Sequence, residues 1–229
     1  MKSSNLAMLK FVAESLGDLL EEVVFVGGST TELYADSSAA PEPRPTEDVD
    51  CIIEVATYHA YHDLEKKLRA KGFANDQTDK APLCRWIYKG TIVDVMPIGE
   101  NILGFTNEWY PTAMNNAIQY TIGSIQINIL NVPYFFATKL SALKSRGMTD
   151  LRTSKDFEDI VYVLNNSASI IRDMSTGAPE VVGYIRKTFS ELLALDVFEE
   201  AVSSVLDYGE PAGTTAKIID LIKNIVAMK

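Results

Sequence analysis

The chain has 229 residues, of which 47% are hydrophobic and 23% charged, and its formal net charge is −10. This composition is typical of a globular protein that buries a core in one large domain or two small ones. The charge excludes a surface broadly coated with Lys and Arg, as extended phosphate contacts need, but not one local basic patch. No apolar run reaches membrane-helix length, and acidic residues interrupt the N-terminal apolar stretch. We therefore expect a cytoplasmic protein without a membrane partner.

The first 72 residues predict helix, strand, loop, strand and helix in that order. Residues 5–20 place apolar side chains at helical spacing. The segment VVFVGG (23–28) is typical of a short buried strand, and a Ser-, Ala- and Pro-rich loop (35–47) leads to the strand VDCIIEV (49–55). A second helix is expected from near Thr57 to Gly72.

Two pairs of strands follow, each joined by a tight turn. CRWIYKG and TIVDVMPIG meet at Lys89-Gly90, and AIQYTIG and SIQINIL meet at Gly123-Ser124. From Pro133 onward the pattern is helical, over segments starting near residues 133, 153, 167, 179, 197 and 215. We therefore predict an α/β core over residues 1–131 and an all-helical domain over residues 132–229.

Asp48 and Asp50 stand at the start of the second strand. Side chains alternate in a strand, so these two carboxylates share one face while Val49 and Cys51 point to the other. Like charges this close favour a cation between them, and a divalent metal is the usual one. The alternative is that the pair is a solvated strand start.

Asp94 interrupts an otherwise apolar strand, TIVDVMP. An unpaired carboxylate buried in such a strand would cost several kcal/mol. If this strand lies beside VDCIIEV, Asp94 joins Asp48 and Asp50, and three carboxylates form a site suited to Mg²⁺.

Gly27, Gly28 and Ser29 follow the first strand. Glycines there let the backbone turn tightly and approach a ligand, and backbone N–H groups would face an anion. An ordinary turn between a strand and a helix is the alternative reading.

In its order of Gly-Ser, Asp-x-Asp and a later strand Asp, the chain resembles the nucleotidyltransferase superfamily of the DNA polymerase β type. "GGSTTELY" followed by "RPTEDVD" is similar to the AbiEii-type abortive-infection toxins, and "ATKLSALKSRG" and "SKDFEDIVYVL" extend the likeness to about residues 23–164. One departure is the spacer of eighteen residues between Ser29 and Asp48, which is usually nearer ten. The surplus falls in the loop, where an insertion costs little.

The resemblance implies a nucleotidyltransferase-type core with a mixed, twisted β-sheet flanked by helices. It also implies transfer of a nucleoside monophosphate from a nucleoside triphosphate (NTP) to an acceptor hydroxyl, with pyrophosphate released. Asp48 and Asp50 would ligate two Mg²⁺ (or Mn²⁺) ions, and Asp94 would hold one of them and accept the hydroxyl proton. The AbiEii likeness implies a toxin that modifies an RNA end, such as that of tRNA, and that has a cognate antitoxin.

Several further residues are candidates for binding the nucleotide. Lys139, also a catalytic candidate, and Arg146 lie seven apart on one helix face, which could meet the triphosphate or be a solvated basic face. Asp156 and Asp159 could orient Lys139 or act as acids favourable to the helix dipole. Arg44 could reach phosphate or pair with an acid. The predicted nucleotide-binding set is Gly27, Gly28, Ser29, Arg44, Lys139, Arg146, Lys155, Asp156 and Asp159.

One local stretch is basic in this acidic chain. It could receive triphosphate, an RNA end or both, or be a plain charged connection; its basic residues are Lys139, Lys144, Arg146, Arg152 and Lys155. We expect Cys51 and Cys84 to be buried free thiols, and His59 and His62 to be surface residues.

Two other functions compete with modification of an RNA end. The first is nucleotidyl transfer to a small hydroxyl compound such as an antibiotic. The second is a non-catalytic relative that binds nucleotide or a partner protein. A non-catalytic relative would normally lose one carboxylate, and Asp48, Asp50 and Asp94 are all present, which favours an enzyme.

Overall fold

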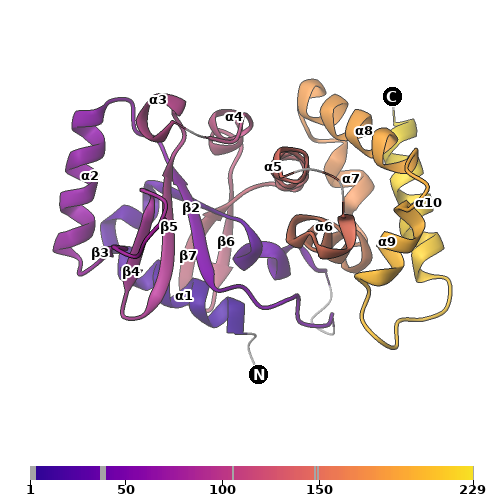
Figure 1. Cartoon of the computed structure of the whole chain (residues 1–229), viewed down its shortest axis with the longest axis horizontal. Helices are drawn as coiled ribbons and strands as arrows, with labels where there is room; N and C mark the ends of the chain where they lie inside the picture. The colour runs from indigo at the N-terminus through magenta and orange to yellow at the C-terminus, as the bar shows by residue number, and fades with distance from the viewer. Residues whose placement is uncertain (1–3, 37–39, 105, 147, 149, 229) are drawn as a thin grey trace. The chain divides into compact units, whose positions relative to one another are not determined.

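The structure, a computed structural model, describes residues 4–36, 40–104, 106–146, 148 and 150–228. It divides into two compact units (Figure 1): Met1–Thr30 with Pro45–Asn131, here the sheet unit, and Thr31–Arg44 with Val132–Lys229, here the helical unit. Among the described residues, no helix combines the length and the apolar character needed to cross a bilayer.

The sheet unit is built on one mixed sheet of seven strands, in the order β3-β4-β5-β2-β1-β7-β6. The β1/β7 and β2/β5 pairs are parallel, and the other neighbouring pairs are antiparallel. This confirms the predicted mixed sheet. The strands are β1 (Val23–Val26), β2 (Asp48–Ile53), β3 (Ala74–Asn75), β4 (Arg85–Tyr88), β5 (Thr91–Pro97), β6 (Ile118–Ile122) and β7 (Ile125–Ile129).

The turn between β4 and β5 determines which residue of β4 lies opposite Asp94 of β5. Lys89 and Gly90 both have positive φ, 47° and 86°, as a two-residue hairpin turn with the twist of its strands requires. Tyr88 therefore lies opposite Thr91, and three residues further along each strand Arg85 lies opposite Asp94.

The helices of the sheet unit are α1 (Ser4–Leu16), α2 (Tyr58–Ala70), α3 (Glu100–Leu103) and α4 (Tyr110–Met114). The predicted helix over 5–20 ends early: the α-helix stops at Leu16, because Gly17 has a φ of +56°, and a 3-10 helix, η1 (Gly17–Glu21), follows. α2 begins as predicted, since the Thr57 side chain accepts a hydrogen bond from the Ala60 N–H at 3.1 Å. The sequence did not predict α3 and α4, which are too short to show helical periodicity.

The helical unit contains α5 (Val132–Ser145), α6 (Lys155–Asn166), α7 (Ile170–Met174), α8 (Pro179–Leu193), α9 (Phe198–Ser204) and α10 (Thr214–Ala227), with a 3-10 turn, η3 (Leu151–Thr153). α5 packs against α6, α7 and α8, and α10 packs against α6, α8 and α9. Aromatic rings fill this core: Phe136 lies 6.0 Å from Phe189, and Tyr34, from the segment before β2, lies 4.4 Å from Phe135. The predicted all-helical C-terminal part is confirmed.

Candidate active site

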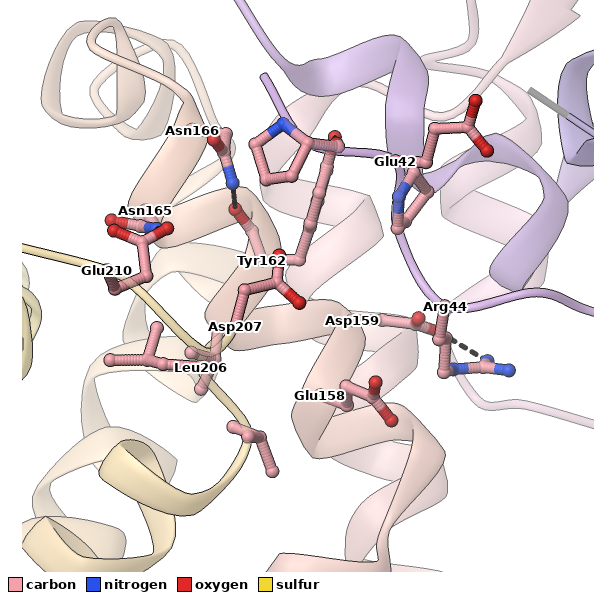
Figure 2. Close-up of a pocket in the computed structure, with 14 residues that line it drawn as sticks. Glu42, Arg44, Glu158, Asp159, Tyr162, Asn165, Asn166, Leu206, Asp207 and Glu210 are labelled. Carbon is pink, nitrogen blue, oxygen red and sulfur yellow. Dashed lines mark hydrogen bonds and ion pairs between the residues drawn. The ribbon is translucent and has the colours of Figure 1, made fainter.

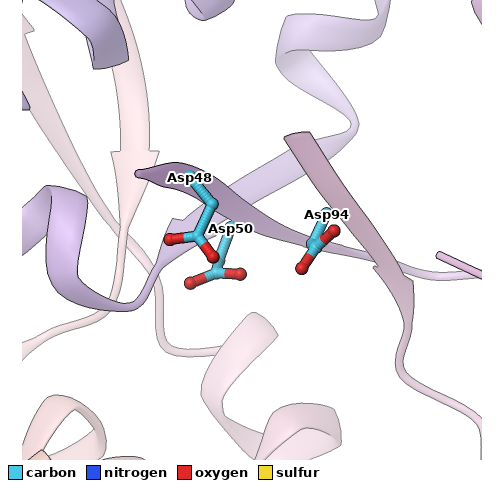
Figure 3. Close-up of side chains that lie close together, drawn as sticks. All are labelled: Asp48, Asp50 and Asp94. Atoms are coloured by element: carbon cyan, nitrogen blue, oxygen red, sulfur yellow. The ribbon is translucent and has the colours of Figure 1, made fainter. Parts of the chain in front are cut away.

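Three carboxylates meet on two neighbouring strands of the sheet unit (Figure 3). β2 and β5 run parallel with Asp50 beside Asp94, and strand alternation puts Asp48 on the same face as Asp50. Ligand oxygens of the three lie within 4.8 Å of one another. Val49 and Cys51 point to the opposite face and are fully buried. The structure thus brings together the three acids that the sequence singled out.

Gly27 closes one side of this carboxylate cluster. It follows β1, whose last residue, Val26, pairs with Asp50, and its φ is +76°. A Cβ built on Gly27 would lie 2.1 Å from Asp50 Oδ2, so a side chain cannot fit there without moving the carboxylate. Glycine is therefore required both by backbone conformation and by the close approach of Asp50.

Ser29 lies two residues beyond Gly27, in the 3-10 helix η2 (Gly28–Tyr34). The residue is only 2% exposed, and its Oγ has no hydrogen-bond partner among the described residues. A buried hydroxyl without a partner costs free energy. The turn itself is held by Thr30, whose Oγ1 donates to the Gly27 carbonyl at 2.9 Å.

Two residues that the sequence did not suggest support Asp48, Thr46 directly and Asn5 through Thr46. Thr46 Oγ1 donates to Asp48 Oδ1 at 2.8 Å, and the Thr46 N–H donates to Asn5 Oδ1 at 3.0 Å. Asn5 comes from α1 and is 2% exposed. Sequence reasoning missed Asn5 because its partner is 41 residues away and reaches it only in the folded sheet unit.

Arg85 is the largest omission from the predicted site. Its Nε donates to Asp94 Oδ1 at 2.9 Å and its Nη2 to Asp94 Oδ2 at 2.7 Å, while Nη2 lies 3.8 Å from Asp48 Oδ2. Hydrogen bonding to Asp94 raises the pKa of Arg85 above its ordinary value, which keeps it charged. The sequence held a signal for this pair, because a two-residue turn at Lys89-Gly90 sets Arg85 opposite Asp94.

The donor set of the cluster fits a divalent cation that prefers oxygen. Three carboxylates on one face, with oxygens close enough to share an ion, are the ligands that Mg²⁺ and related ions take in proteins. Asp94 is the member whose two oxygens already accept hydrogen bonds from Arg85.

The two thiols near the cluster are neutral. Burial raises the pKa of Cys84 to about 12, with Asp94 adding to the shift, and burial together with Asp50 raises that of Cys51 as well. Both are free and buried, as predicted. They therefore supply no thiolate for metal binding or nucleophilic attack.

Four more of the predicted site residues gather within the helical unit around Lys139; they are Arg44, Arg146, Asp156 and Asp159. Lys139 is 7% exposed, and its Nζ donates to Asp159 Oδ2 at 2.6 Å and Asp156 Oδ1 at 3.2 Å. Arg44 donates to Asp159 at 2.9 Å, and Arg146 pairs with Asp156. Burial by itself lowers the pKa of Lys139, but attraction to Asp159 and Asp156 outweighs it and leaves the pKa raised.

Two of the contacts considered from the sequence are present in this network. Asp156 and Asp159 both hold Lys139, and Arg44 pairs with an acid. The rest of the basic stretch is also mostly neutralised: Lys144 pairs with Glu191 at 2.6 Å, and Arg152 pairs with two acids. In the described part of the chain, Lys155 is the member of the stretch without an ion pair, and it is exposed at the start of α6.

A small pocket in the helical unit lies beside the pairing of Arg44 with Asp159 (Figure 2). Glu42, Glu158 and Tyr162 also line it, and its volume is about 30 Å³. That volume holds one or two water molecules, so this pocket by itself does not accommodate a nucleotide. Burial raises the pKa of Glu158 at its wall.

Comparisons with known proteins give structural likeness only. No family model matches the chain, and no curated protein sequence matches it. The antibiotic-resistance factor ANT(2'')-Ia is 11% identical at a TM-score of 0.50, with 87% of this chain and 99% of that one covered. An antigenic nucleotidyltransferase-like protein from Paracoccidioides brasiliensis is 17% identical at a TM-score of 0.49, with 87% of this chain and 92% of that one covered. JHP933 from Helicobacter pylori is 11% identical at a TM-score of 0.48, with 99% of this chain and 94% of that one covered.

These identities are too low to carry an activity from one protein to another. The likeness to ANT(2'')-Ia extends over nearly the whole of both chains and shows a common fold. Structures similar to this chain thus include nucleotidyltransferase-like proteins, and its fold is an α/β core with a helical C-terminal part of the kind that ANT(2'')-Ia has.

Proposed function

We propose that this protein is a metal-dependent nucleotidyltransferase, which moves a nucleoside monophosphate from an NTP to an acceptor hydroxyl. The observation that carries the proposal is the cluster of Asp48, Asp50 and Asp94, with oxygens within 4.8 Å, beside a glycine that Asp50 approaches closely. Transfer of a phosphoryl-type group depends mostly on positioning and charge neutralisation, which such a cluster serves when it holds divalent ions.

Each carboxylate has a proposed role at this cluster. Asp48 and Asp50 would hold Mg²⁺ or Mn²⁺, with Asp48 oriented by the hydrogen bond from Thr46. The bound ions would supply Lewis-acid stabilisation of the charge on the reacting phosphate. Asp94 would also ligate metal and accept the proton of the acceptor hydroxyl, at an oxygen that here accepts from Arg85.

Ser29 supports a phosphate site at the same end of the strands. Its buried Oγ lacks a partner among the described residues, and a phosphate oxygen would satisfy it. We therefore propose that Gly27 and Gly28 allow close approach of the triphosphate and that Ser29 donates to it. The nucleotide-binding roles of Arg44, Lys139, Arg146, Lys155, Asp156 and Asp159 stay predictions, as does the catalytic role of Lys139.

The acceptor that we propose is an RNA end, such as that of tRNA, modified by an AbiEii-like toxin with a cognate antitoxin. The sequence likeness of GGSTTELY and RPTEDVD to those toxins supports it. A small hydroxyl compound such as an antibiotic is the second candidate acceptor. Two observations favour it: acids pair with most of the basic stretch, and the fold is shared with an antibiotic-resistance factor.

The test incubates the purified protein with Mg²⁺ or Mn²⁺, each labelled NTP in turn, and either total RNA or a panel of hydroxyl compounds. We expect label in an acceptor and release of pyrophosphate. Asp48→Asn should lower the rate at least a thousandfold, because it removes a metal ligand while leaving the fold intact. Asp63→Asn, a partly exposed acid of α2 outside the cluster, is the matched control and should keep full activity.

The outcomes separate the three functions. Label in tRNA supports the toxin, and label in a small compound supports the second acceptor. NTP binding without transfer to any acceptor would favour the non-catalytic relative. An Asp48→Asn variant as active as the parent would remove the proposed mechanism.

A further inference from the structure

Arg85 places a fixed positive charge inside the carboxylate cluster. It donates to both oxygens of Asp94, at 2.9 and 2.7 Å, and the Nη2 that makes the shorter bond is also 3.8 Å from Asp48 Oδ2. The guanidinium therefore lies between carboxylates of two different strands, β2 and β5. In this arrangement it serves as the cation that neighbouring carboxylates need.

The position of Arg85 follows from the register of its strand, and its charge is permanent. The hairpin register places Arg85 directly opposite Asp94, and the side chain is 26% exposed. An arginine side chain is not deprotonated in proteins, so the guanidinium stays charged. Only a competing cation or a rotamer change can remove this charge from Asp94.

A divalent ion bound to Asp94 would lie close to the positive charge of the Arg85 guanidinium. Mg²⁺ binds carboxylate oxygens at about 2.1 Å. Because Nη2 is 2.7 Å from Asp94 Oδ2, an ion on that oxygen would lie within about 5 Å of the guanidinium. At this distance and with Asp94 only 7% exposed, water screens the repulsion between the two cations weakly.

We propose that Arg85 is a built-in counter-cation that competes with divalent metal for Asp94, holding the metal-free cluster together and weakening its metal affinity. Metal binding then requires the guanidinium to turn away from Asp94. This inference rests on one part of the proposed function, namely that Asp94 is a metal ligand. The opposite role, in which Arg85 positions Asp94 for the metal, predicts an affinity change of the opposite sign.

The test measures Mn²⁺ binding to the full chain without nucleotide, by electron paramagnetic resonance of the free ion. Arg85→Gln should lower the dissociation constant at least tenfold, because the competing charge is gone. Arg85→Lys should fall between that variant and the parent, since an ammonium lacks the fork that reaches both oxygens. It also serves if Arg85→Gln does not fold.

Two controls separate competition at Asp94 from a general loss of charge. Arg69→Gln removes an arginine that stacks over Trp86, 5.5 Å from the ring, on the face of β4 opposite to Arg85, and should leave Mn²⁺ affinity unchanged. In an Asp94→Asn background, Arg85→Gln should no longer tighten binding.

Unchanged or weaker Mn²⁺ binding in both Arg85→Gln and Arg85→Lys overturns the inference and makes Arg85 a positioning residue. If neither the parent nor the variants bind Mn²⁺, both this inference and the metal site of the proposed function fall. Tighter binding in the variants together with no nucleotidyl transfer by the parent upholds the inference and removes only the proposed function.

Discussion

At the scale of single residues, the candidate site depends on a glycine and a carboxylate that share one space. Gly27 has a left-handed φ of +76°, and Asp50 Oδ2 occupies the position that a Cβ on Gly27 would take. The backbone therefore forms part of the wall around the cluster. A turn residue of any other type would push Asp50 away from Asp48 and Asp94.

Gly27→Ala tests this arrangement. The left-handed backbone costs a non-glycine residue about 1–2 kcal/mol, and displacement of Asp50 adds a loss of metal affinity. Gly90→Ala is the matched control: Gly90 has a φ of +86°, but a Cβ there would meet nothing within 4 Å. We expect both variants to unfold more easily in urea, and Gly27→Ala alone to bind Mn²⁺ at least tenfold more weakly. Equal Mn²⁺ affinity in the two variants would contradict the role of Asp50.

At the scale of elements, acidic residues of α6 form ion pairs with α5 and with the segment that precedes β2. Asp159 on α6 is 1% exposed and accepts hydrogen bonds from Lys139 of α5 and from Arg44. Asp156, one turn earlier on α6, accepts from Lys139 as well. Within the helical unit these ion pairs hold together three segments of the chain: α5, α6 and the segment that contains Arg44.

Asp159→Asn should destabilise the helical unit, by about 3–5 kcal/mol, because removing one partner of a buried ion pair leaves the other charge poorly compensated. Urea unfolding followed by circular dichroism measures this. Asp150→Asn removes an equal charge from an exposed pair with Arg152 and should change the unfolding free energy very little. Hydrogen exchange should also speed up around Arg44 in Asp159→Asn. A variant as stable as Asp150→Asn would show that the network contributes little.

The same network has a pH dependence of defined sign. The pKa of Lys139 is raised in the folded protein, so its stabilising contribution is fully present below the ordinary lysine pKa of 10.5 and is lost as pH rises through the folded value. In Asp159→Asn the folded pKa should fall, because one of its two acidic partners is gone. The alkaline loss of stability should therefore be smaller in this variant than in the parent, and it should be complete at a lower pH.

At the scale of the whole molecule, both tryptophans, Trp86 and Trp109, belong to the sheet unit, which also holds the carboxylate cluster. Tryptophan fluorescence therefore follows the unfolding of the unit to which metal would bind. Because the unfolded chain does not hold the three carboxylates together, Mn²⁺ should stabilise the folded form.

We expect Mn²⁺ at a hundred times its dissociation constant to add about 2.7 kcal/mol to the unfolding free energy seen by fluorescence. Asp50→Asn should abolish this gain, whereas Asp63→Asn should keep it. A midpoint that Mn²⁺ does not move in the parent would argue against metal binding at the cluster.

Much of this architecture follows from local patterns. Alternation along β2 put Asp48 and Asp50 on one face, and helical periodicity predicted α2, α5 and α6. These features depend on neighbours in sequence, and a single chain displays them directly. Hairpin register is nearly as local, because the two-residue turn at Lys89-Gly90 is enough to place Arg85 opposite Asp94.

Other features were decided only when distant segments met. That β5 lies beside β2, so that Asp94 completes the cluster, depends on strand order, which no local pattern specifies. The burial of Lys139 depends likewise on how α5 packs against α6, whereas its spacing from Arg146 fits an exposed face equally well. The sequence by itself determined which residue types and faces were available for chemistry. The tertiary structure decided their partners, because the segments that pack around a charged side chain determine whether it has an ion-pair partner.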